Sequence, residues 1–375
     1  MELKKIQKTS IMSSFSILPD PRKERNQEYT LFEIITIAIL GVLCGADDWV
    51  SISAWGEANQ EWLQKIGLCK KGVPSHDTFS RFFRYVDSKA FEECFIQWTQ
   101  KIAKAFQEII ALDGKTLRSS KEGNEKAIHI VSAFAVKNDL VLGQLATEKK
   151  SNEITAFPLL LKILDLENSI VTIDAAGCQK DIAKIIIQKK GDYLLAVKGN
   201  QKKLFDELGN FFDQAIECSE EEVGYDYYST EEKSRNRIEK REVWTVEDLE
   251  WLSQKKDWEG LKTISCIKST RTYKEKTSIE FRYYISSLSK DAKRIAESIR
   301  GHWGVENKLH WQLDVSYNED KCKVRKDNGA ENFSVLRRAT LNLLKKDKKT
   351  KAGIANKRLK AGWSKKYLLE VLDMA

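Results

Sequence analysis

Two aspartates follow apolar runs that are typical of buried β-strands. Asp113 ends the run IIALD and Asp174 ends the run IVTID. The strand and helix pattern around them predicts that the two strands are neighbours in one sheet, which would bring the carboxylates together. Adjacent acidic groups repel each other unless a cation lies between them, so the pair predicts a site for a hard divalent metal ion. A single aspartate in this position is more often a turn former or a helix cap.

A third acid lies in HWGVENKLHW, where His302, Glu306 and His310 follow one another at intervals of four residues. Such residues share one face of a helix. Phosphoryl transfer with two metal ions needs a third carboxylate to bridge and balance the cations, and Glu306 is the predicted one. The HExxH spacing of zinc proteases is absent. Three other acids of the same stretch remain alternatives, with Asp314 foremost: Asp314, Glu319 and Asp320.

Donors suited to phosphate groups accompany these acids in the sequence. Basic and amide side chains follow Asp113, precede the helix that begins near Glu153, and follow the last predicted core strand. Such donors position phosphates, and a tryptophan can stack on an unpaired base. Each one alone is more often solvated surface, or core in the case of tryptophan. The predicted DNA-contacting residues are Lys115, Lys149, Lys150, Asn152, Lys198, Asn200, Gln201, Arg300, His302 and Trp303.

The elements that must position these residues follow from periodicity. Residues 1–107 have helical spacing and predict a helical N-terminal domain. From Ile109, three short strands predict a meander, after which helix, strand, helix and strand alternate, as in a parallel or mixed sheet with covering helices. This order is that of an RNase H-like catalytic core, so the predicted fold is α/β, with residues 108–200 as the first part of the core. Residues 201–290 predict a β-rich insertion, residues 291–345 a core helix with the third acid, and residues 346–375 a basic helical C-terminus.

Positive charge is concentrated near the C-terminal end. The chain has 63 Lys and Arg against 55 Asp and Glu, a net charge of +8. Residues 321–375 hold 16 Lys and Arg against 5 Asp and Glu, so this segment accounts for the whole excess. A solvated tail would explain the charge, but nucleic acid is the more informative interpretation. The segment is therefore expected to supply much of the sequence-independent phosphate binding.

The composition is that of a packed, ordered protein, with 42% hydrophobic and 31% charged residues. Its seven cysteines are scattered and never spaced as CxxC, which favours neither a disulfide framework nor a zinc site. The N-terminus lacks the pattern of a signal peptide, and the longest apolar run, residues 34–46, is too short to span a bilayer. We expect a cytoplasmic, nucleoid-associated protein with no membrane partner.

Many segments together resemble one known family. They are DPRKERNQEYTLFEI, GADDW, PSHDTFSRFF, ALDGKTLR, KSNEITAFPLLL, VTIDAAGCQKDIA, DYLLAVKGNQ, RYYISSL, HWGVENKLHWQLDV, NFSVLRRATLNLLK and KRLKAGW. In this order they resemble the ISAs1 insertion-sequence transposases, which include the H-repeat-associated proteins, over about residues 15–372. One departure is RNRIE, at residues 235–239, where the family commonly has HGRIE. A histidine role at that place is therefore in doubt.

The resemblance implies a DDE transposase with an RNase H-like core and the triad Asp113, Asp174 and Glu306. It implies Mg²⁺ as cofactor, with Mn²⁺ as a substitute, and double-stranded DNA as partner, both terminal inverted repeats and target DNA. A homodimer in the DNA complex is expected because two ends must be joined. Two alternatives are a structure-specific nuclease with the same metals and a decayed copy that binds DNA without catalysis. A glycosidase with paired carboxylates is weaker, because it predicts neither the basic C-terminus nor the split core.

Overall fold

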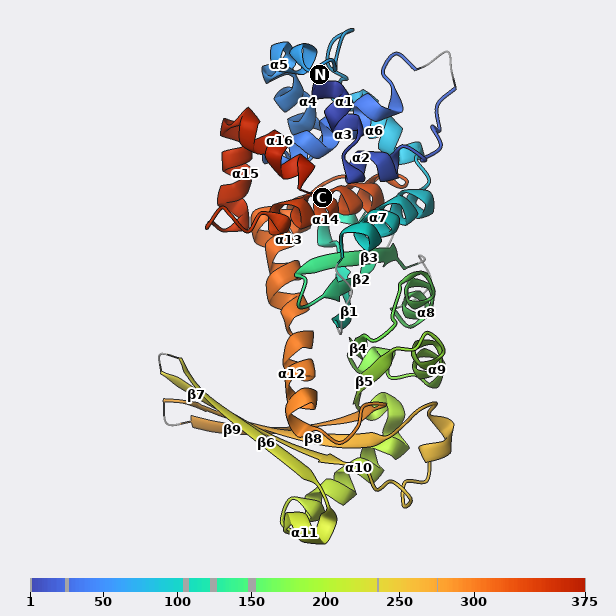
Figure 1. Ribbon diagram of the computed structural model, residues 1–375, viewed down its shortest axis with the longest axis vertical. Helices are drawn as coiled ribbons and strands as arrows, with labels where there is room; N and C mark the ends of the chain where they lie inside the picture. Colours follow the sequence, from blue (N-terminus) through green and yellow to red (C-terminus); the bar gives the residue numbers. More distant parts are fainter. Residues whose placement is uncertain are drawn as a thin grey trace.

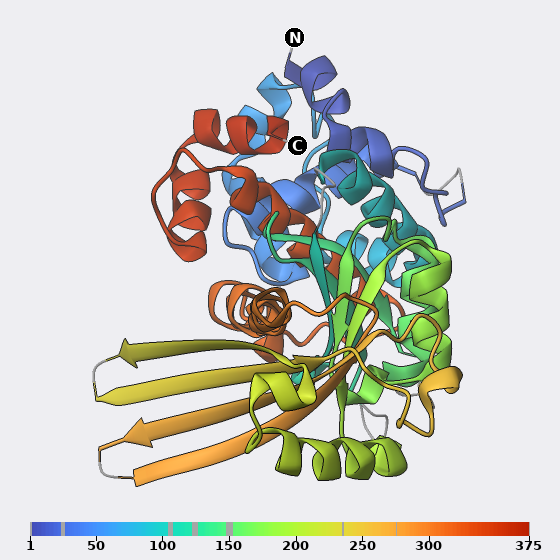
Figure 2. The same ribbon diagram turned by 60° about the horizontal axis from the view of Figure 1, so that its bottom comes forward.

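Among the described residues, one mixed sheet of nine strands runs through the protein in the order β3-β2-β1-β4-β5-β9-β8-β7-β6 (Figures 1 and 2). The computed structural model describes residues 2–23, 27–103, 108–121, 127–147, 153–234, 236–274 and 276–374. The strands are β1 (Ile109–Thr116), β2 (His129–Ala135), β3 (Leu140–Ala146), β4 (Ile170–Ile173), β5 (Asp192–Val197), β6 (Asp226–Ser234), β7 (Arg237–Val246), β8 (Thr263–Tyr273) and β9 (Lys276–Ser286).

The first five strands form the predicted core. Strands β1, β2 and β3 pair antiparallel as a meander, while β4 pairs parallel with β1 and β5 pairs parallel with β4. The crossovers between the parallel strands are the helices α8 (Glu153–Ile163) and α9 (Lys180–Gln188). Their apolar side chains share one buried cluster with β1, β4 and β5, so they cover one face of the sheet. The mixed α/β fold and the neighbouring positions of β1 and β4 are confirmed.

The inserted segment begins with helix, continues as strands and joins the core sheet. It begins with α10 (Lys202–Ala215) and α11 (Glu220–Val223), and β6 to β9 follow. Strand β9 pairs antiparallel with β5, from Leu194 opposite Ser286 to Val197 opposite Tyr283. The insertion therefore extends the sheet at the β5 edge. The outer half of β9 is exposed, and the four strands project from the body of the protein (Figure 2).

The helices at the two ends of the chain pack together beside the meander (Figure 1). The described N-terminal residues form helices, and the side chains of Thr30 and Ser75 cap two of them by accepting hydrogen bonds from backbone N–H groups. No helix among the described residues is long and apolar enough to span a membrane. The helices are α1 (Glu2–Gln7), α2 (Ser10–Phe15), α3 (Leu31–Leu43), α4 (Trp49–Ala58), α5 (Gln60–Lys65), α6 (His76–Tyr85), α7 (Ser88–Ile102), α14 (Gly329–Lys346), α15 (Ile354–Trp363) and α16 (Lys365–Asp373).

Part of the C-terminal positive charge is buried. Helix α14 lies between the N-terminal helices and β3, and its Arg337 and Arg338 are fully buried. Lys345 donates to Asp139 at 2.7 Å, and the buried Arg358 guanidinium donates to the carbonyl of Val42. The charge that a partner can reach is therefore smaller than the composition of residues 321–375 indicates.

Helix α12 (Ala292–His302) crosses the face of the sheet opposite α8 and α9. Asp291 caps it by accepting a hydrogen bond from the backbone N–H of Arg294. Its apolar face, Ile295 and Ile299, packs against β4 and β5. The chain then continues through a π-helical turn, Glu306–His310, into α13 (Trp311–Ser316). This continuous stretch carries the predicted third acid past the strands that carry the two aspartates.

Candidate functional site

The two aspartates lie where the parallel pairing of β1 and β4 stops. The last pair is Leu112 with Ile173, and Asp113 and Asp174 are the next residues of their strands. The prediction that the strand ends at Asp113 is wrong, because β1 continues beside β2 to Thr116. Asp174 also caps a short 3₁₀ turn by accepting a hydrogen bond from the N–H of Ala176 at 3.0 Å. Asp174 therefore serves as a cap and still borders the same space as Asp113.

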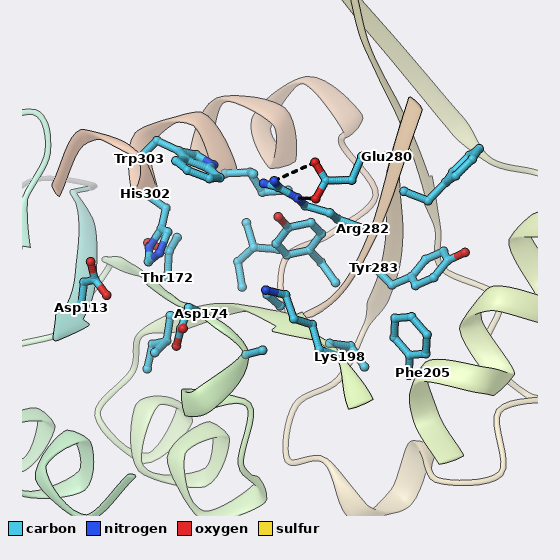
Figure 3. A pocket seen from close by; sticks show the side chains of 18 of the residues that line it. Asp113, Thr172, Asp174, Lys198, Phe205, Glu280, Arg282, Tyr283, His302 and Trp303 are labelled. Atoms are coloured by element: carbon cyan, nitrogen blue, oxygen red, sulfur yellow. Dashed lines mark hydrogen bonds and ion pairs between the residues drawn. The ribbon is translucent and has the colours of Figure 1, made fainter. Parts of the chain in front are cut away.

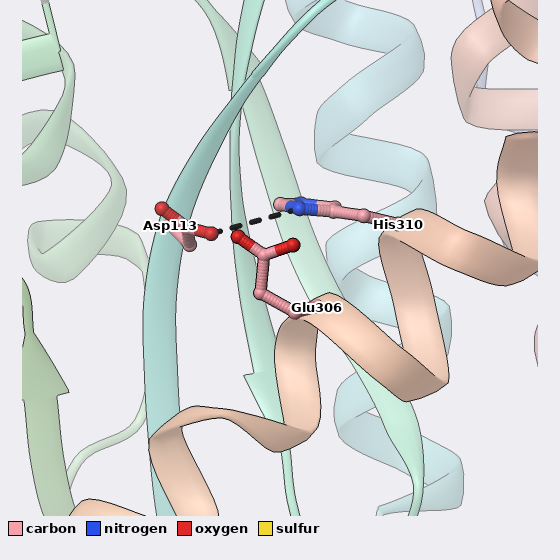
Figure 4. Close-up of side chains that lie close together, drawn as sticks. All are labelled: Asp113, Glu306 and His310. Atoms are coloured by element: carbon pink, nitrogen blue, oxygen red, sulfur yellow. Dashed lines mark ion pairs between the residues drawn. The ribbon is translucent and has the colours of Figure 1, made fainter. Parts of the chain in front are cut away.

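Glu306 and His310 approach Asp113 from the π-helical turn (Figure 4). One side-chain ligand atom from each of the three residues lies within 4.8 Å of the others. Side chains two residues apart on a strand point to the same face of the sheet, so Asp113 lies on the same face as Ala111. This face is the one that α12 covers, opposite α8 and α9. Asp174 is not in this group of three, but it lines the same pocket. The predicted face of the α12 stretch thus meets the first aspartate.

The acids of the site are not paired with a cation of the described residues. Within the described chain, no Lys or Arg forms an ion pair with Asp113, Asp174 or Glu306. The pKa of Asp113 is raised to about 7, mainly by burial; the N–H of Gly114 lowers this pKa, while the carboxylates of Glu306, Asp174 and Glu153 act in the same direction as burial. Ionising Asp113 is therefore costly unless a cation is present.

The buried His310 imidazole is uncharged. Burial lowers the pKa of His310 to about 3, and the nearby Arg338 and Lys115 act in the same direction. The contact between His310 Nδ1 and Asp113 Oδ2, 3.6 Å, is therefore not an ion pair at neutral pH. It is also longer than a hydrogen bond.

The other acids of the stretch are each neutralised. Lys115 Nζ lies 2.7 Å from Asp314 Oδ1, an ion pair by distance although its atoms are not aligned as a hydrogen bond. The same lysine lies 3.1 Å from Asp320, and Glu319 pairs with Arg338 at 2.9 Å with both side chains fully buried. These alternatives to Glu306 already have cationic partners inside the protein.

A pocket of about 450 Å³ opens beside the carboxylates (Figure 3). Its walls include Thr172 and Lys198 from the core, and Arg282 from the inserted β9. Arg282 donates two hydrogen bonds to Glu280, and its guanidinium lies 5.0 Å from the ring centre of Trp303. The pocket thus combines acids, cations and an exposed aromatic ring.

The predicted DNA-contacting residues divide into two sets. Lys198, His302 and Trp303 line the pocket, and Trp303 is 45% exposed. His302 Nδ1 lies 3.1 Å from the hydroxyl of Thr172.

The remaining predicted residues hold the protein together in this conformation. Lys115 is buried in the ion pairs described above, and Arg300 pairs with Glu232 of β6 at 2.6 Å. Asn200 and Gln201 donate to the carbonyls of Ala175 and Cys178 and so brace the turn after Asp174. Lys149, Lys150 and Asn152 lie outside the described residues.

Sequence reasoning missed the pocket walls that come from the insertion. Arg282 and Tyr283 carry no local signal because only tertiary pairing of β9 with β5 brings them there, and Phe205 comes from α10.

The expected basic segment begins with an exposed loop at residues 321–326, in which the exposed side chains are Lys321, Lys323, Arg325 and Lys326. This basic loop lines a second cavity of about 720 Å³ with His76 and Arg84.

Two family models match the chain. The one described as "Transposase DDE domain" covers residues 104–343, and the one described as "DDE_Tnp_1-associated" covers residues 12–99. The first spans the core strands, the insertion and the α12 stretch, and so includes Asp113, Asp174 and Glu306.

Curated relatives match nearly the whole chain. "Putative transposase YncI" of Escherichia coli O157:H7 is 44% identical over 97% of this chain and 94% of its own length. "H repeat-associated putative transposase YhhI" of Escherichia coli K12 is 42% identical over 99% and 98%. A solved synaptic complex of piggyBac transposase with hairpin DNA is similar with a TM-score of 0.47 and 13% identity, over 98% of this chain and 78% of that one.

Proposed function

The chain belongs to the DDE transposase family, and on this premise we propose that it moves an insertion sequence element by metal-dependent cleavage and strand transfer of DNA. The observation that carries the proposal is that Asp113, Asp174 and Glu306 line one pocket and that no Lys or Arg of the described residues forms an ion pair with them. We further infer an RNase H-like core, supported by the meander β1-β2-β3 followed by two strands parallel to β1.

Mg²⁺ is the proposed cofactor, with Mn²⁺ as a substitute. Carboxylate oxygens are the ligands that these ions prefer. The raised pKa of Asp113 fits a cation site, because a bound divalent ion would stabilise the ionised carboxylate. Bound at Asp113, Asp174 and Glu306, two such ions would activate water or a freed 3′-hydroxyl for in-line attack on a phosphodiester.

The side chains around the acids would position the DNA. Lys198 supplies a cation at the pocket wall for a phosphate beside Asp174, and Trp303 presents a ring face on which an unpaired base can stack. Asn200 and Gln201 act indirectly, since their hydrogen bonds hold the turn that carries Asp174. Arg300 can reach DNA only by leaving Glu232.

The basic loop at residues 321–326 is the proposed surface for backbone contacts outside the pocket. Arg325 donates to the carbonyl of Ser119, and Asn328 donates to the carbonyl of Val86, so the loop is fixed between the β1–β2 connection and the N-terminal helices. Its exposed lysines face solvent and make no ion pair within the described part of the chain. The proposed partners are terminal inverted repeats, target DNA and a second protomer.

A cleavage and strand-transfer assay tests this function. Purified protein, duplex DNA carrying the element ends, a supercoiled target and Mg²⁺ should give cleaved ends and joined products. Glu306→Gln should give neither cleaved ends nor joined products. Asp314→Asn, a matched acid-to-amide change at an acid that pairs with Lys115, should give both products. Cleavage without joining would favour a structure-specific nuclease. DNA binding without either product would indicate a copy that has lost catalysis.

A further inference from the structure

We propose that His310 is itself a metal ligand, so that one divalent ion is held by two carboxylates and one imidazole nitrogen. The proposal rests on the proposed function, because it concerns the same metal centre, but it assigns a residue outside the acidic triad. The ligand set is Asp113, Glu306 and His310.

The geometry suits shared coordination. The three residues offer ligand atoms within 4.8 Å of one another, and Asp113 Oδ2 lies 3.6 Å from His310 Nδ1. Two ligands that each bind an ion at about 2.0–2.2 Å lie roughly 3–4 Å apart. The observed separation is too long for a direct hydrogen bond and short enough for a common ion.

One ring nitrogen of His310 is buried without a protein partner. The side chain is 10% exposed, and its Nε2 has no hydrogen-bond partner within the described chain. Leaving such a group unsatisfied costs about 1–3 kcal/mol, so buried nitrogens of this kind are rare without a water or an ion.

The local backbone presents Glu306 and His310 together. The N–H of Trp311 donates to the carbonyl of Glu306, an i to i+5 bond that makes residues 306–310 one π-helical turn. Such turns are rare and occur often at functional sites. Leu309, between the two residues, is fully buried and anchors the turn in the core. Both side chains are thereby directed at β1 (Figure 4).

The other three histidines have different surroundings. His302 lies 3.1 Å from the hydroxyl of Thr172, and His129 lies 2.5 Å from Glu153. His76 is at the exposed start of α6, with 54% of its side chain accessible. Among the four histidines, His310 is the one whose side chain lies close to both Asp113 and Glu306. The exposed His76 is therefore the control position for a histidine substitution.

A nitrogen ligand changes the metal preference. Both Mg²⁺ and Mn²⁺ prefer oxygen ligands, but Mg²⁺ takes oxygen almost always, whereas Mn²⁺, a transition ion, accepts an imidazole nitrogen more readily. We therefore expect this centre to bind Mn²⁺ more tightly than Mg²⁺, and His310→Gln to reduce that preference.

Pulsed electron paramagnetic resonance of bound Mn²⁺ tests the assignment without measuring activity. Wild-type protein and His76→Gln should show ¹⁴N modulation from a coordinated imidazole, and protein made with [¹⁵N]histidine should show ¹⁵N coupling instead. His310→Gln should lose the modulation and bind Mn²⁺ roughly tenfold more weakly or worse. The isotope label needs no substitution, so the test holds even if His310→Gln folds poorly.

The outcomes separate this inference from the proposed function. Bound Mn²⁺ without histidine coupling in wild-type protein, or coupling that survives in His310→Gln, overturns the role of His310. Asp113→Asn should abolish the binding. If Mn²⁺ binds Asp113→Asn as well as wild type, or does not bind wild type at all, the metal centre of the proposed function fails with it.

Discussion

Two neighbouring groups of acids on the same elements have opposite surroundings. On β1, Asp113 and Lys115 point to the same face of the sheet, because they are two residues apart. Asp113 lies close to Glu306 and His310, and no cation of the described residues pairs with either acid, whereas Lys115 lies close to Asp314 and Asp320 and neutralises them. Charge compensation inside the described part of the protein thus separates the acids that form internal ion pairs from the acids that we propose to bind metal. The first group is the metal group, and the second is the paired group, which also includes Glu319 with Arg338.

The largest effect is expected in the metal group. Asp113→Asn or Glu306→Gln removes a charge needed to hold the cations, so cleavage should fall by at least about a thousandfold, the scale of losing one electrostatic catalytic group. DNA binding and the folded state should persist, as gel shift and circular dichroism would show. Asp314→Asn is the control from the paired group and should keep most of the cleavage. Equal losses in both groups would remove the distinction between them.

The next largest effect is on stability, and it should come from the paired group. Glu319 and Arg338 form an ion pair with both side chains fully buried. Glu319→Ala leaves the guanidinium buried without its partner, which costs about 3–5 kcal/mol. Urea unfolding would measure the change. The double variant Glu319→Leu with Arg338→Met should recover much of the lost free energy of unfolding. If Glu319→Ala is as stable as the wild-type protein, the ion pair does not hold the α13–α14 connection.

The exposed basic loop should give a smaller, salt-dependent effect. Replacing Lys321, Lys323 and Lys326 by glutamine removes three exposed cations that form no ion pair with any other described residue, whereas the basic residues of α14 and α15 are largely buried. The slope of log K against log salt for DNA binding should fall by up to about 3, because each phosphate contact contributes about 0.9. Truncation after Leu344 is a poorer test, because α15 and α16 pack on the core. The matched control is a variant that loses the same charge outside the basic loop, with glutamine in place of Lys348, Lys349 and Lys351.

The smallest predicted effect is on the metal-free protein. The pKa of Asp113 is raised from 3.8 to about 7, so between these pH values the unfolded chain has released this proton and the folded chain retains it. Stability therefore falls as pH rises through that window, and Asp113→Asn avoids the cost. In EDTA, the variant should melt a few degrees above wild type at pH 8 and at the same temperature at pH 4. A lower melting temperature at pH 8 would mean that ionised Asp113 is stabilised within the protein.

The two aspartates of the site were predictable from local sequence pattern. Asp113 and Asp174 could be predicted to meet, because apolar runs, turn residues and the order of helices define which strands pair. Glu306 could be placed on a helix face toward them. Ser75 and Thr30 cap helices, a role in which serine and threonine are common. These features depend on short-range chemistry, which a single sequence contains.

Other parts of the site depend on contacts between distant residues. The pairing of β9 with β5 brings Arg282 to the pocket, and nothing near residue 282 indicates it. Lys115 was predicted to bind DNA, but whether a lysine is free or paired depends on Asp314, some 200 residues later in the chain. The π-helical turn at Glu306 is likewise set by burial of Leu309 and Val305 in a core that both ends of the chain build.

Thermal denaturation with added Mg²⁺ or Mn²⁺ tests the central claim most directly, namely that the unneutralised acids are the metal ligands. An ion that binds only the folded state stabilises it by about 2.7 kcal/mol at a hundred times its Kd. Wild-type protein and Asp314→Asn should show the same metal-dependent rise in Tm, and Glu306→Gln should show little or none. If Asp314→Asn loses the rise while Glu306→Gln keeps it, the paired group binds the metal, which contradicts the assignment of Glu306 as a metal ligand.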